Sequence, residues 1–139
     1  MHILMTGGTG LIGTATSTVL QESGHKLTIL TRRAPRETDD ATYVTALADC
    51  AEPVDAVINL AGAGLADRRW SSAYKRQIVS SRVDLTRELV AWLGECEQPP
   101  GKLISASAIG YYGAAEDQTF TESGEPGTGF AAELCQSWE

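Results

Sequence analysis

Short apolar runs alternate with segments of helical periodicity along the 139 residues of the chain. The apolar runs are typical of buried strands and occupy residues 2–6, 26–31, 42–47, 54–60 and 102–107. Helical spacing predicts helices over residues 11–23, 71–95 and 130–139, and Pro99, Pro100 and Gly101 follow the longest of them as breakers. Residues 32–41 are polar and charged, so we expect a loop with some helix there.

The first helix is expected to turn an apolar face to the rest of the protein. The residues available for this face are Leu11, Ile12, Ala15, Val19 and Leu20. Gly24 is expected to end this helix, because glycine readily takes the backbone conformation that follows a helix.

Strands separated by crossover segments imply a parallel sheet that helices cover on both faces. We therefore expect an α/β fold of the doubly wound Rossmann type, with strand order 3-2-1-4-5. Its ligand crevice should lie beyond the carboxyl ends of strands one and four. Residues 1–139 form one dinucleotide-binding domain in this interpretation. The usual final strands are missing, so we expect an incomplete sheet, truncated before its last strands.

Charge and composition limit the kinds of partner that the protein can bind and the cellular compartment expected for it. A formal net charge of −7 argues against a nucleic-acid or anionic-membrane surface, so backbone amides and a few arginines must hold any phosphate. Cys50, Cys96 and Cys135 form no CxxC pair and are typical of reduced cytoplasmic thiols rather than of disulfides or a metal site. His2 and His25 lie at strand starts and are expected to be structural. No stretch approaches transmembrane length, and a cytoplasmic location is expected.

A glycine-rich turn follows the first strand and opens the first helix. Gly8, Gly10 and Gly13 spell GxGxxG, whereas Gly7, Gly10 and Gly13 spell GxxGxxG. Such a turn lets the backbone approach a pyrophosphate, which the amides and the positive end of the helix then bind. A β-carbon at Gly10 would block that approach, and one at Gly13 would push the helix away from the strand. The alternative is a glycine-rich turn without a ligand.

The end of the second strand distinguishes the two nicotinamide dinucleotides. An NAD site places an acidic residue there for the adenosine ribose, and an NADP site places a cation for the 2′-phosphate. This chain has Thr31, Arg32 and Arg33, and the first acid is Glu37. NADP(H) is therefore favoured over NAD, because an arginine can bind a phosphate in bidentate fashion. The alternative is that both arginines are solvated surface charges.

Several motifs occur together in one order: "TGGTGLIG" at 6–13, "NLAG" at 59–62 and "SASAIGYYG" at 105–113. With them the chain resembles the extended, epimerase-like branch of the short-chain dehydrogenase/reductase superfamily. The segments 69–90 and 129–139 are similar to the NAD(P)-binding epimerase-family oxidoreductases of unknown substrate. Those proteins are about twice as long, and the resemblance implies that their substrate-binding C-terminal part is absent here. It also favours the GxxGxxG interpretation of the glycine turn.

The resemblance implies a role for each matching residue. The turn and the start of its helix would surround the pyrophosphate, the arginines would bind the adenosine phosphate, and the end of the fourth strand would line the nicotinamide ribose. These cofactor-binding residues are Gly7, Thr9, Gly10, Leu11, Ile12, Gly13, Arg32, Arg33, Leu60, Ala61 and Gly62. Ser107 corresponds to the serine that polarises a substrate carbonyl, and Tyr111 occupies a tyrosine position of the family. The alternative for "NLAG" is a buried strand end without a ligand. The alternative for Ser107 is a hydroxyl that bonds to local backbone.

The chain departs from the superfamily at its usual acid/base pair. Hydride transfer there normally uses a tyrosine whose pKa is lowered by a lysine four residues on. Ala131 and Cys135 stand at these two positions. The proton could come instead from Tyr111 or Tyr112, or from Glu133 if burial raised its pKa. Cys135 could act as a nucleophile, although no base or cation is apparent for it.

Two functional hypotheses follow. The first is an NADP(H)-dependent oxidoreductase or nucleotide-sugar-epimerase-like enzyme that acts on a carbonyl or alcohol, with the dinucleotide and a small-molecule substrate as partners. The second is a non-catalytic NAD(P)-binding sensor or interaction module, which the missing Tyr–Lys pair favours. A homodimer is considered for either, and a truncated domain without a substrate site is a third interpretation.

Overall fold

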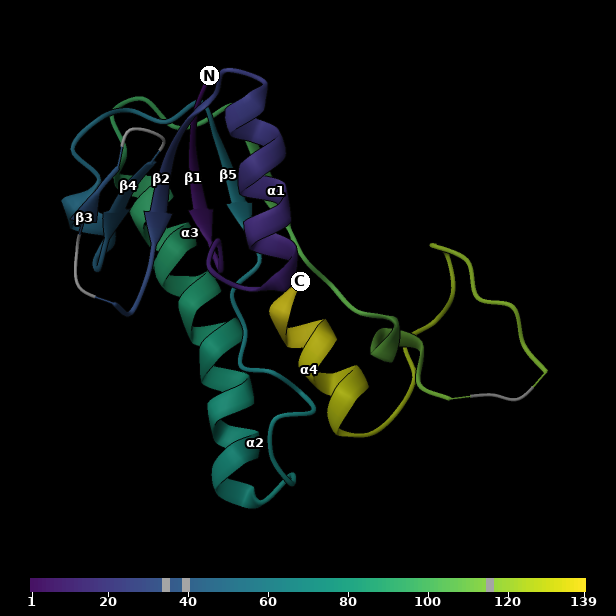
Figure 1. Ribbon diagram of the computed structural model, residues 1–139. Helices are drawn as coiled ribbons and strands as arrows, with labels where there is room; N and C mark the ends of the chain where they lie inside the picture. Colours follow the sequence, from purple (N-terminus) through teal and green to yellow (C-terminus); the bar gives the residue numbers. More distant parts are fainter. Residues whose placement is uncertain (34–35, 39–40, 115–116) are drawn as a thin grey trace.

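The computed structural model describes residues 1–33, 36–38, 41–114 and 117–139. Six strands form one sheet in the order β3-β4-β2-β1-β5-β6 (Figure 1). The strands are β1 (His2–Thr6), β2 (Lys26–Leu30), β3 (Arg36–Glu37), β4 (Ala41–Val44), β5 (Ala56–Asn59) and β6 (Lys102–Ser105). All pairs are parallel except β3 with β4. Without β3, the order is the predicted 3-2-1-4-5, so the Rossmann fold is confirmed.

The core occupies both faces of this sheet because side chains alternate along β1. Ile3 packs on one face with Leu27 and Ile29, and Leu20 of helix α1 (Leu11–Glu22) covers them. Leu4 packs on the other face, where Leu89 of helix α3 (Leu85–Glu95) covers it. The central strand is therefore buried on both sides, which explains its uninterrupted apolar sequence.

The predicted apolar face of α1 is wrong except at Leu20, because Leu11, Ile12, Ala15 and Val19 are all exposed. Leu11 and Ile12 are 92% and 68% exposed, whereas the buried residues of the helix are Gly13 and Ser17. Small residues are selected here because α1 crosses very close to the turn that precedes it. The predicted stop is confirmed: Gly24 has φ +78°, and its amide bonds back to the helix carbonyl of Gln21 at 2.8 Å.

The long predicted helix over 71–95 is present, with an irregular centre. It consists of α2 (Ser72–Val79), a π-helical segment η2 (Ser80–Asp84) and α3. The Ser71 hydroxyl caps α2 by accepting from the Tyr74 amide at 3.2 Å. Where a polar loop was expected at 32–41, the structure has the short antiparallel strand β3. Residues 34–35 and 39–40 of that segment lie outside the described residues.

The chain after β6 leads away from the sheet and returns with its last helix beside α2 (Figure 1). A 3₁₀ turn, η3 (Ile109–Tyr112), packs against helix α4 (Phe130–Trp138). Buried Leu134 and Trp138 of α4 join Tyr74, Ile78 and Val83 in a third apolar cluster. β6 itself is exposed along its whole length. In the described part of the chain, no helix is long and apolar enough to cross a membrane.

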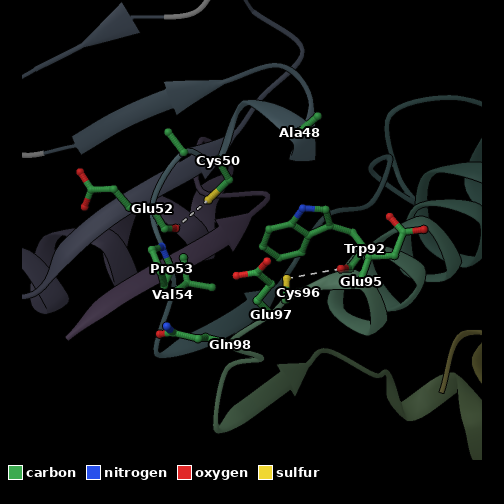
Figure 2. A pocket seen from close by; sticks show the side chains of 11 residues that line it. Ala48, Cys50, Glu52, Pro53, Val54, Trp92, Glu95, Cys96, Glu97 and Gln98 are labelled. Atoms are coloured by element: carbon green, nitrogen blue, oxygen red, sulfur yellow. Dashed lines mark hydrogen bonds between the residues drawn. The ribbon is translucent and has the colours of Figure 1, made fainter.

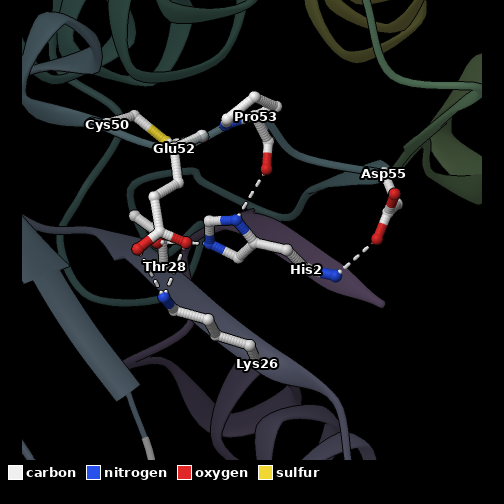
Figure 3. A network of polar contacts seen from close by, with 7 residues as sticks. All are labelled: His2, Lys26, Thr28, Cys50, Glu52, Pro53 and Asp55. Carbon is white, nitrogen blue, oxygen red and sulfur yellow. Dashed lines mark hydrogen bonds and ion pairs between the residues drawn. The ribbon is translucent and has the colours of Figure 1, made fainter.

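The two histidines lie at the amino ends of the strands, as expected for structural residues. The His2 ring lies 2.8 Å from both the Pro53 carbonyl oxygen and the Thr28 hydroxyl, and its amide donates to Asp55 at 2.6 Å (Figure 3). His25 Nδ1 lies 3.4 Å from the amino terminus. These contacts tie the start of β1 to β2 and to the segment before β5.

An exposed ion pair between Lys26 and Glu52 lies beside this network, and its effect on the Glu52 carboxyl can be tested. Lys26 Nζ lies 2.7 Å from the Glu52 carboxylate, and its hydrogen bond and charge lower the pKa of that carboxyl. The pair therefore stabilises the folded state above the ordinary glutamate pKa, and this contribution disappears as pH falls through the lowered pKa. We expect Lys26→Met to raise the pKa of Glu52, measured by carboxyl-carbon NMR titration. An unchanged titration curve would contradict the pairing.

Candidate functional site

A cleft of about 810 Å³ lies where the strands end, in the position predicted for the ligand crevice. Four loops and one helix form its wall. The lining residues are Thr6, Gly7, Thr9 and Gly10 at and after the end of β1; Leu30, Thr31, Arg32 and Arg33 at and after the end of β2; Thr45 and Ala46 after β4; Leu60, Ala61, Gly62 and Ala63 after β5; and Ser81, Leu85 and Glu88 of η2 and α3. The cleft thus gathers segments that are distant in the sequence.

The glycine turn is built by two close backbone approaches. Gly7 has φ +70°, and a β-carbon there would lie 2.6 Å from the Leu60 carbonyl. A β-carbon at Gly13 would lie 2.1 Å from the Gly7 oxygen, so α1 touches the turn directly. At Gly10 a β-carbon would meet only the Gly7 oxygen, at 3.3 Å, and Gly10 lines the cleft. Gly8 is buried against core side chains instead, so the geometry favours the GxxGxxG interpretation.

The amino end of α1 is suited to an anion. Gly10 precedes the helix, no side chain caps it, and the first turn carries no acidic residue. The unpaired amides of this turn and the positive end of the helix dipole therefore remain available to a phosphate. The exposed side chains of Leu11 and Ile12 are not part of the cleft wall, so these residues can contribute only backbone amides.

Arg32 and Arg33 lie on the cleft wall and are both exposed. Among the residues described, no carboxylate pairs with either guanidinium. The Arg33 amide donates to the Thr31 hydroxyl at 3.2 Å, which stabilises the turn after β2. Glu88 of α3 also lines the cleft, and the sequence interpretation missed it.

A hydrogen-bond network centred on the buried Asn59 side chain holds the end of β5. The Ala61 amide donates to the Thr6 hydroxyl at 3.1 Å, and that hydroxyl donates to Asn59 Oδ1 at 2.6 Å. Asn59 Nδ2 donates to the hydroxyls of Thr86 and Ser105, at 2.9 and 3.0 Å. The network joins β1, β5, β6 and α3 directly behind the Leu60–Gly62 wall. Sequence reasoning did not identify Thr6 or Asn59 as positioning residues, and the available signal was a polar residue at the end of each apolar strand.

The two predicted catalytic residues lie beyond the cleft wall. Ser107 follows β6, is exposed, and donates a short hydrogen bond to the Glu139 carboxylate. The Tyr111 ring makes an edge-to-face contact with Tyr112, with ring centroids 5.1 Å apart. Tyr112 in turn stacks on Phe120 at 5.0 Å, which makes it a packing residue. In the part of the chain that is described, no hydrogen bond connects Ser107 with Tyr111.

The residues at the Tyr–Lys positions pack α4 against the preceding 3₁₀ turn. Ala131 lies next to Gly110, where an added β-carbon would be 3.3 Å from its methyl group. Cys135 is buried, its thiol points to the Ala108 carbonyl at 3.7 Å, and burial raises its pKa. A raised pKa keeps the thiol protonated, which disfavours the nucleophile interpretation. Glu133 is exposed, so the burial required for it to act as an acid is absent.

A second hollow of about 440 Å³ lies near the start of β5, between the segment 48–54 and the end of α3 (Figure 2). Its thiols are engaged locally: Cys50 donates to the Glu52 carbonyl at 3.8 Å and Cys96 to the Trp92 carbonyl at 3.4 Å. Burial raises the pKa of Cys50. This hollow contains neither the glycine turn nor an arginine, so it does not have the chemistry of a dinucleotide site. No group of three or more His, Cys, Asp or Glu side chains among the described residues could hold a metal.

The strand order, the glycine turn between β1 and α1, and the cleft at the strand ends define a Rossmann domain of the NAD(P)-binding type. Residues 3–133 match the family model described as "NAD dependent epimerase/dehydratase family", and the chain belongs to this family. The resemblance stated from the motifs is thereby confirmed.

Individual relatives agree with this assignment. The chain is 40% identical over 148 residues to the epimerase family protein YfhF of Bacillus subtilis, covering 100% of this chain and 48% of YfhF. It superposes on the crystal structure of human epimerase family protein SDR39U1 (isoform 2) with NADPH at a TM-score of 0.87 and 28% identity, covering 99% and 47% of the two chains. A nucleoside-diphosphate sugar epimerase from Corynebacterium glutamicum gives a TM-score of 0.79 and 31% identity, covering 99% and 29%. The chain spans about half the length of the curated relatives it matches.

Proposed function

We propose that this chain supplies the NADP(H)-binding domain of an oxidoreductase or epimerase-like enzyme that acts on a carbonyl or alcohol substrate. The observation that carries the proposal is one cleft lined both by the glycine turn and by two arginines without a carboxylate partner among the described residues. The relative from human was crystallised with NADPH, which supports the same cofactor here. A cytoplasmic location, a small-molecule substrate and a homodimer stay predictions.

The residues of the cleft fit such a cofactor. The Gly7–Gly10 turn and the first amides of α1 would hold the pyrophosphate, since Gly10 leaves space on the cleft side. Arg32 and Arg33 would bind the 2′-phosphate, and the Leu60–Gly62 wall would position the nicotinamide ribose. When bound, the cofactor supplies or receives the hydride.

Ser107 and Tyr111 would bind the oxygen of the substrate carbonyl or alcohol. The Ser107 hydroxyl proton points at the Glu139 carboxylate, so it must turn away from this carboxylate to polarise a substrate carbonyl. Ala131 and Cys135 stand where a phenol and an ammonium group would otherwise supply the proton. This observation favours the second candidate function, a sensor that binds NAD(P) without turning it over.

A single-turnover experiment tests the proposal and separates the two candidates. Protein loaded with NADPH is mixed with a panel of aldehydes, ketones and nucleotide sugars, and oxidation of the nicotinamide is followed by its absorbance. Oxidation that Ser107→Ala slows while NADPH binding is unchanged supports the enzyme. Tight NADPH binding with no oxidation across the panel supports the sensor.

Arg32→Ala tests the cofactor preference. Removing one charge-assisted phosphate contact is expected to weaken NADPH binding by about 1.5–3 kcal/mol, roughly 10- to 150-fold in Kd, and to leave NADH affinity little changed. Fluorescence titration of both cofactors measures the two effects. Arg87→Ala is the matched control, because Arg87 is exposed on α3 and pairs with Asp84 at 3.7 Å. Equal affinity of the unmodified protein for NADPH and NADH would contradict the preference.

A further inference from the structure

Arg82 stands out among the basic residues because of where the fold places it. It lies in the π-helical segment η2, directly after Ser81, which lines the cleft. π-helical turns are rare, and they recur at functional sites. This turn interrupts a helix that would otherwise be continuous, and it presents Arg82 to the back of the cleft wall.

The guanidinium of Arg82 lies close to two other parts of the chain. The first is Gly62, where a β-carbon would lie 2.6 Å from Arg82 Cζ, so a larger residue there would require this guanidinium to move. The second is the Trp138 ring, whose centroid lies 5.3 Å from Cζ in a cation–π contact. A cation–π contact uses the charge of a guanidinium and does not occupy its N–H groups.

The N–H groups of Arg82 are almost entirely unpaired. A guanidinium carries five N–H donors, and this one makes a single long hydrogen bond, from Nη1 to the Ile78 carbonyl at 3.4 Å. No carboxylate lies within ion-pair distance of Arg82 in the described ranges. Burial lowers the pKa of Arg82, so the cation has lost part of its hydration without gaining a counter-ion.

A second donor beside Arg82 also lacks an acceptor. Trp138 is buried, and its Nε1 has no hydrogen-bond partner in the described chain. Arg82 differs from Trp138 in being only half-buried, so its free N–H groups remain accessible to a ligand. An anion with several oxygens would satisfy the fork of a guanidinium.

We infer that Arg82 binds an anionic oxygen group, a carboxylate or a phosphate, of the substrate. The inference rests on the proposed function, from which we take the position of the cofactor along the cleft. In that arrangement the cofactor phosphates lie at the glycine turn and at Arg32 and Arg33. Arg82 lies behind Gly62, at the nicotinamide end of the cofactor. The substrate class is therefore an anionic carbonyl or alcohol compound.

Malonate and inorganic phosphate are suitable probes for the test. Each is titrated by calorimetry into the protein with and without NADPH, and Arg82→Gln is compared with Arg87→Gln, a charge-neutralising control on the same helix. We expect Arg82→Gln to weaken binding of at least one probe by about 10-fold or more, while Arg87→Gln leaves it unchanged. NADPH affinity is expected to be the same in both variants. Arg82→Lys, which keeps the charge and loses the fork, should bind the probe with intermediate affinity and serves where Arg82→Gln does not fold.

Three results would overturn the inference. The first is that neither probe binds to the unmodified protein, and the second is that Arg82→Gln (or Arg82→Lys, where Arg82→Gln does not fold) binds the probe as tightly as the unmodified protein does. The third is a parallel loss of NADPH affinity, which would assign Arg82 to the cofactor. The outcome is separable from that of the proposed function. Probe binding that depends on Arg82 supports the anion site even if no compound of the carbonyl panel is reduced. Reduction of neutral compounds alone would support the enzyme and contradict the anion site.

Discussion

Gly13→Ala is expected to destabilise the protein by about 3 kcal/mol and to abolish measurable NADPH binding. The new β-carbon would lie 2.1 Å from the Gly7 carbonyl oxygen and 2.7 Å from the Gly8 Cα atom. Both are backbone atoms, so no side chain can rotate away, and α1 itself must move off the turn. That movement would displace the amides that face the cleft. Urea unfolding measures the first effect and nicotinamide fluorescence titration the second.

Gly94→Ala is the matched control for this substitution. Gly94 lies in α3, and a β-carbon there would have no neighbour within 4 Å. Alanine is favoured over glycine in a helix, so this variant should be more stable by about 0.5–1 kcal/mol and should bind NADPH normally. A Gly13→Ala protein as stable as the unmodified one would show that α1 does not contact the turn as described.

The strands and their order could be predicted because their signals are local. Each parallel strand is a short apolar run between breakers, and the crossover rule then leaves few orders for five such runs. The inward face of α1 could not be predicted in this way. Leu11 and Ile12 have helical spacing suited to a core, but the turn at Gly7 comes so close that only Gly13 and Ser17 fit beneath the helix. A contact between backbones leaves no signal in hydrophobic periodicity.

Local sequence signals likewise predicted one part of the candidate site and not the other. The glycine turn, the arginines after β2 and the Leu60–Gly62 wall each follow directly from a strand end, so sequence reasoning placed them in one cleft. Ser81, Leu85 and Glu88 follow helical spacing, yet nothing local indicates which side of the long helix faces the cleft. Arg82 depends on a π-helical turn and on Trp138, more than fifty positions along the chain, and this juxtaposition exists only after folding.

Asn59→Ala is the other substitution for which we expect a large effect, a loss of about 3 kcal/mol of stability. Asn59 is 1% exposed and holds three hydroxyls, those of Thr6, Thr86 and Ser105, from three different elements. Without its amide the buried Thr6 hydroxyl and the half-buried Thr86 hydroxyl lose their partner, whereas Ser105 lies on the exposed strand β6, where its hydroxyl can turn to water. Urea unfolding of Asn59→Ala is compared with that of Ser105→Ala, which removes only one hydroxyl of the network. For Ser105→Ala we expect the free energy of unfolding to fall by about 1 kcal/mol.

The same substitution connects stability with binding. The Thr6 hydroxyl donates to Asn59 and so turns its lone pairs to the Ala61 amide, which holds the wall at Leu60–Gly62 in place. Without Asn59, the Thr6 hydroxyl can rotate and the wall loses its fixed position. We therefore expect Asn59→Ala to weaken NADPH binding, although Asn59 is not part of the cleft wall, and Ser105→Ala to leave it unchanged. If both variants bound NADPH like the unmodified protein, the network would stabilise the sheet without shaping the cleft.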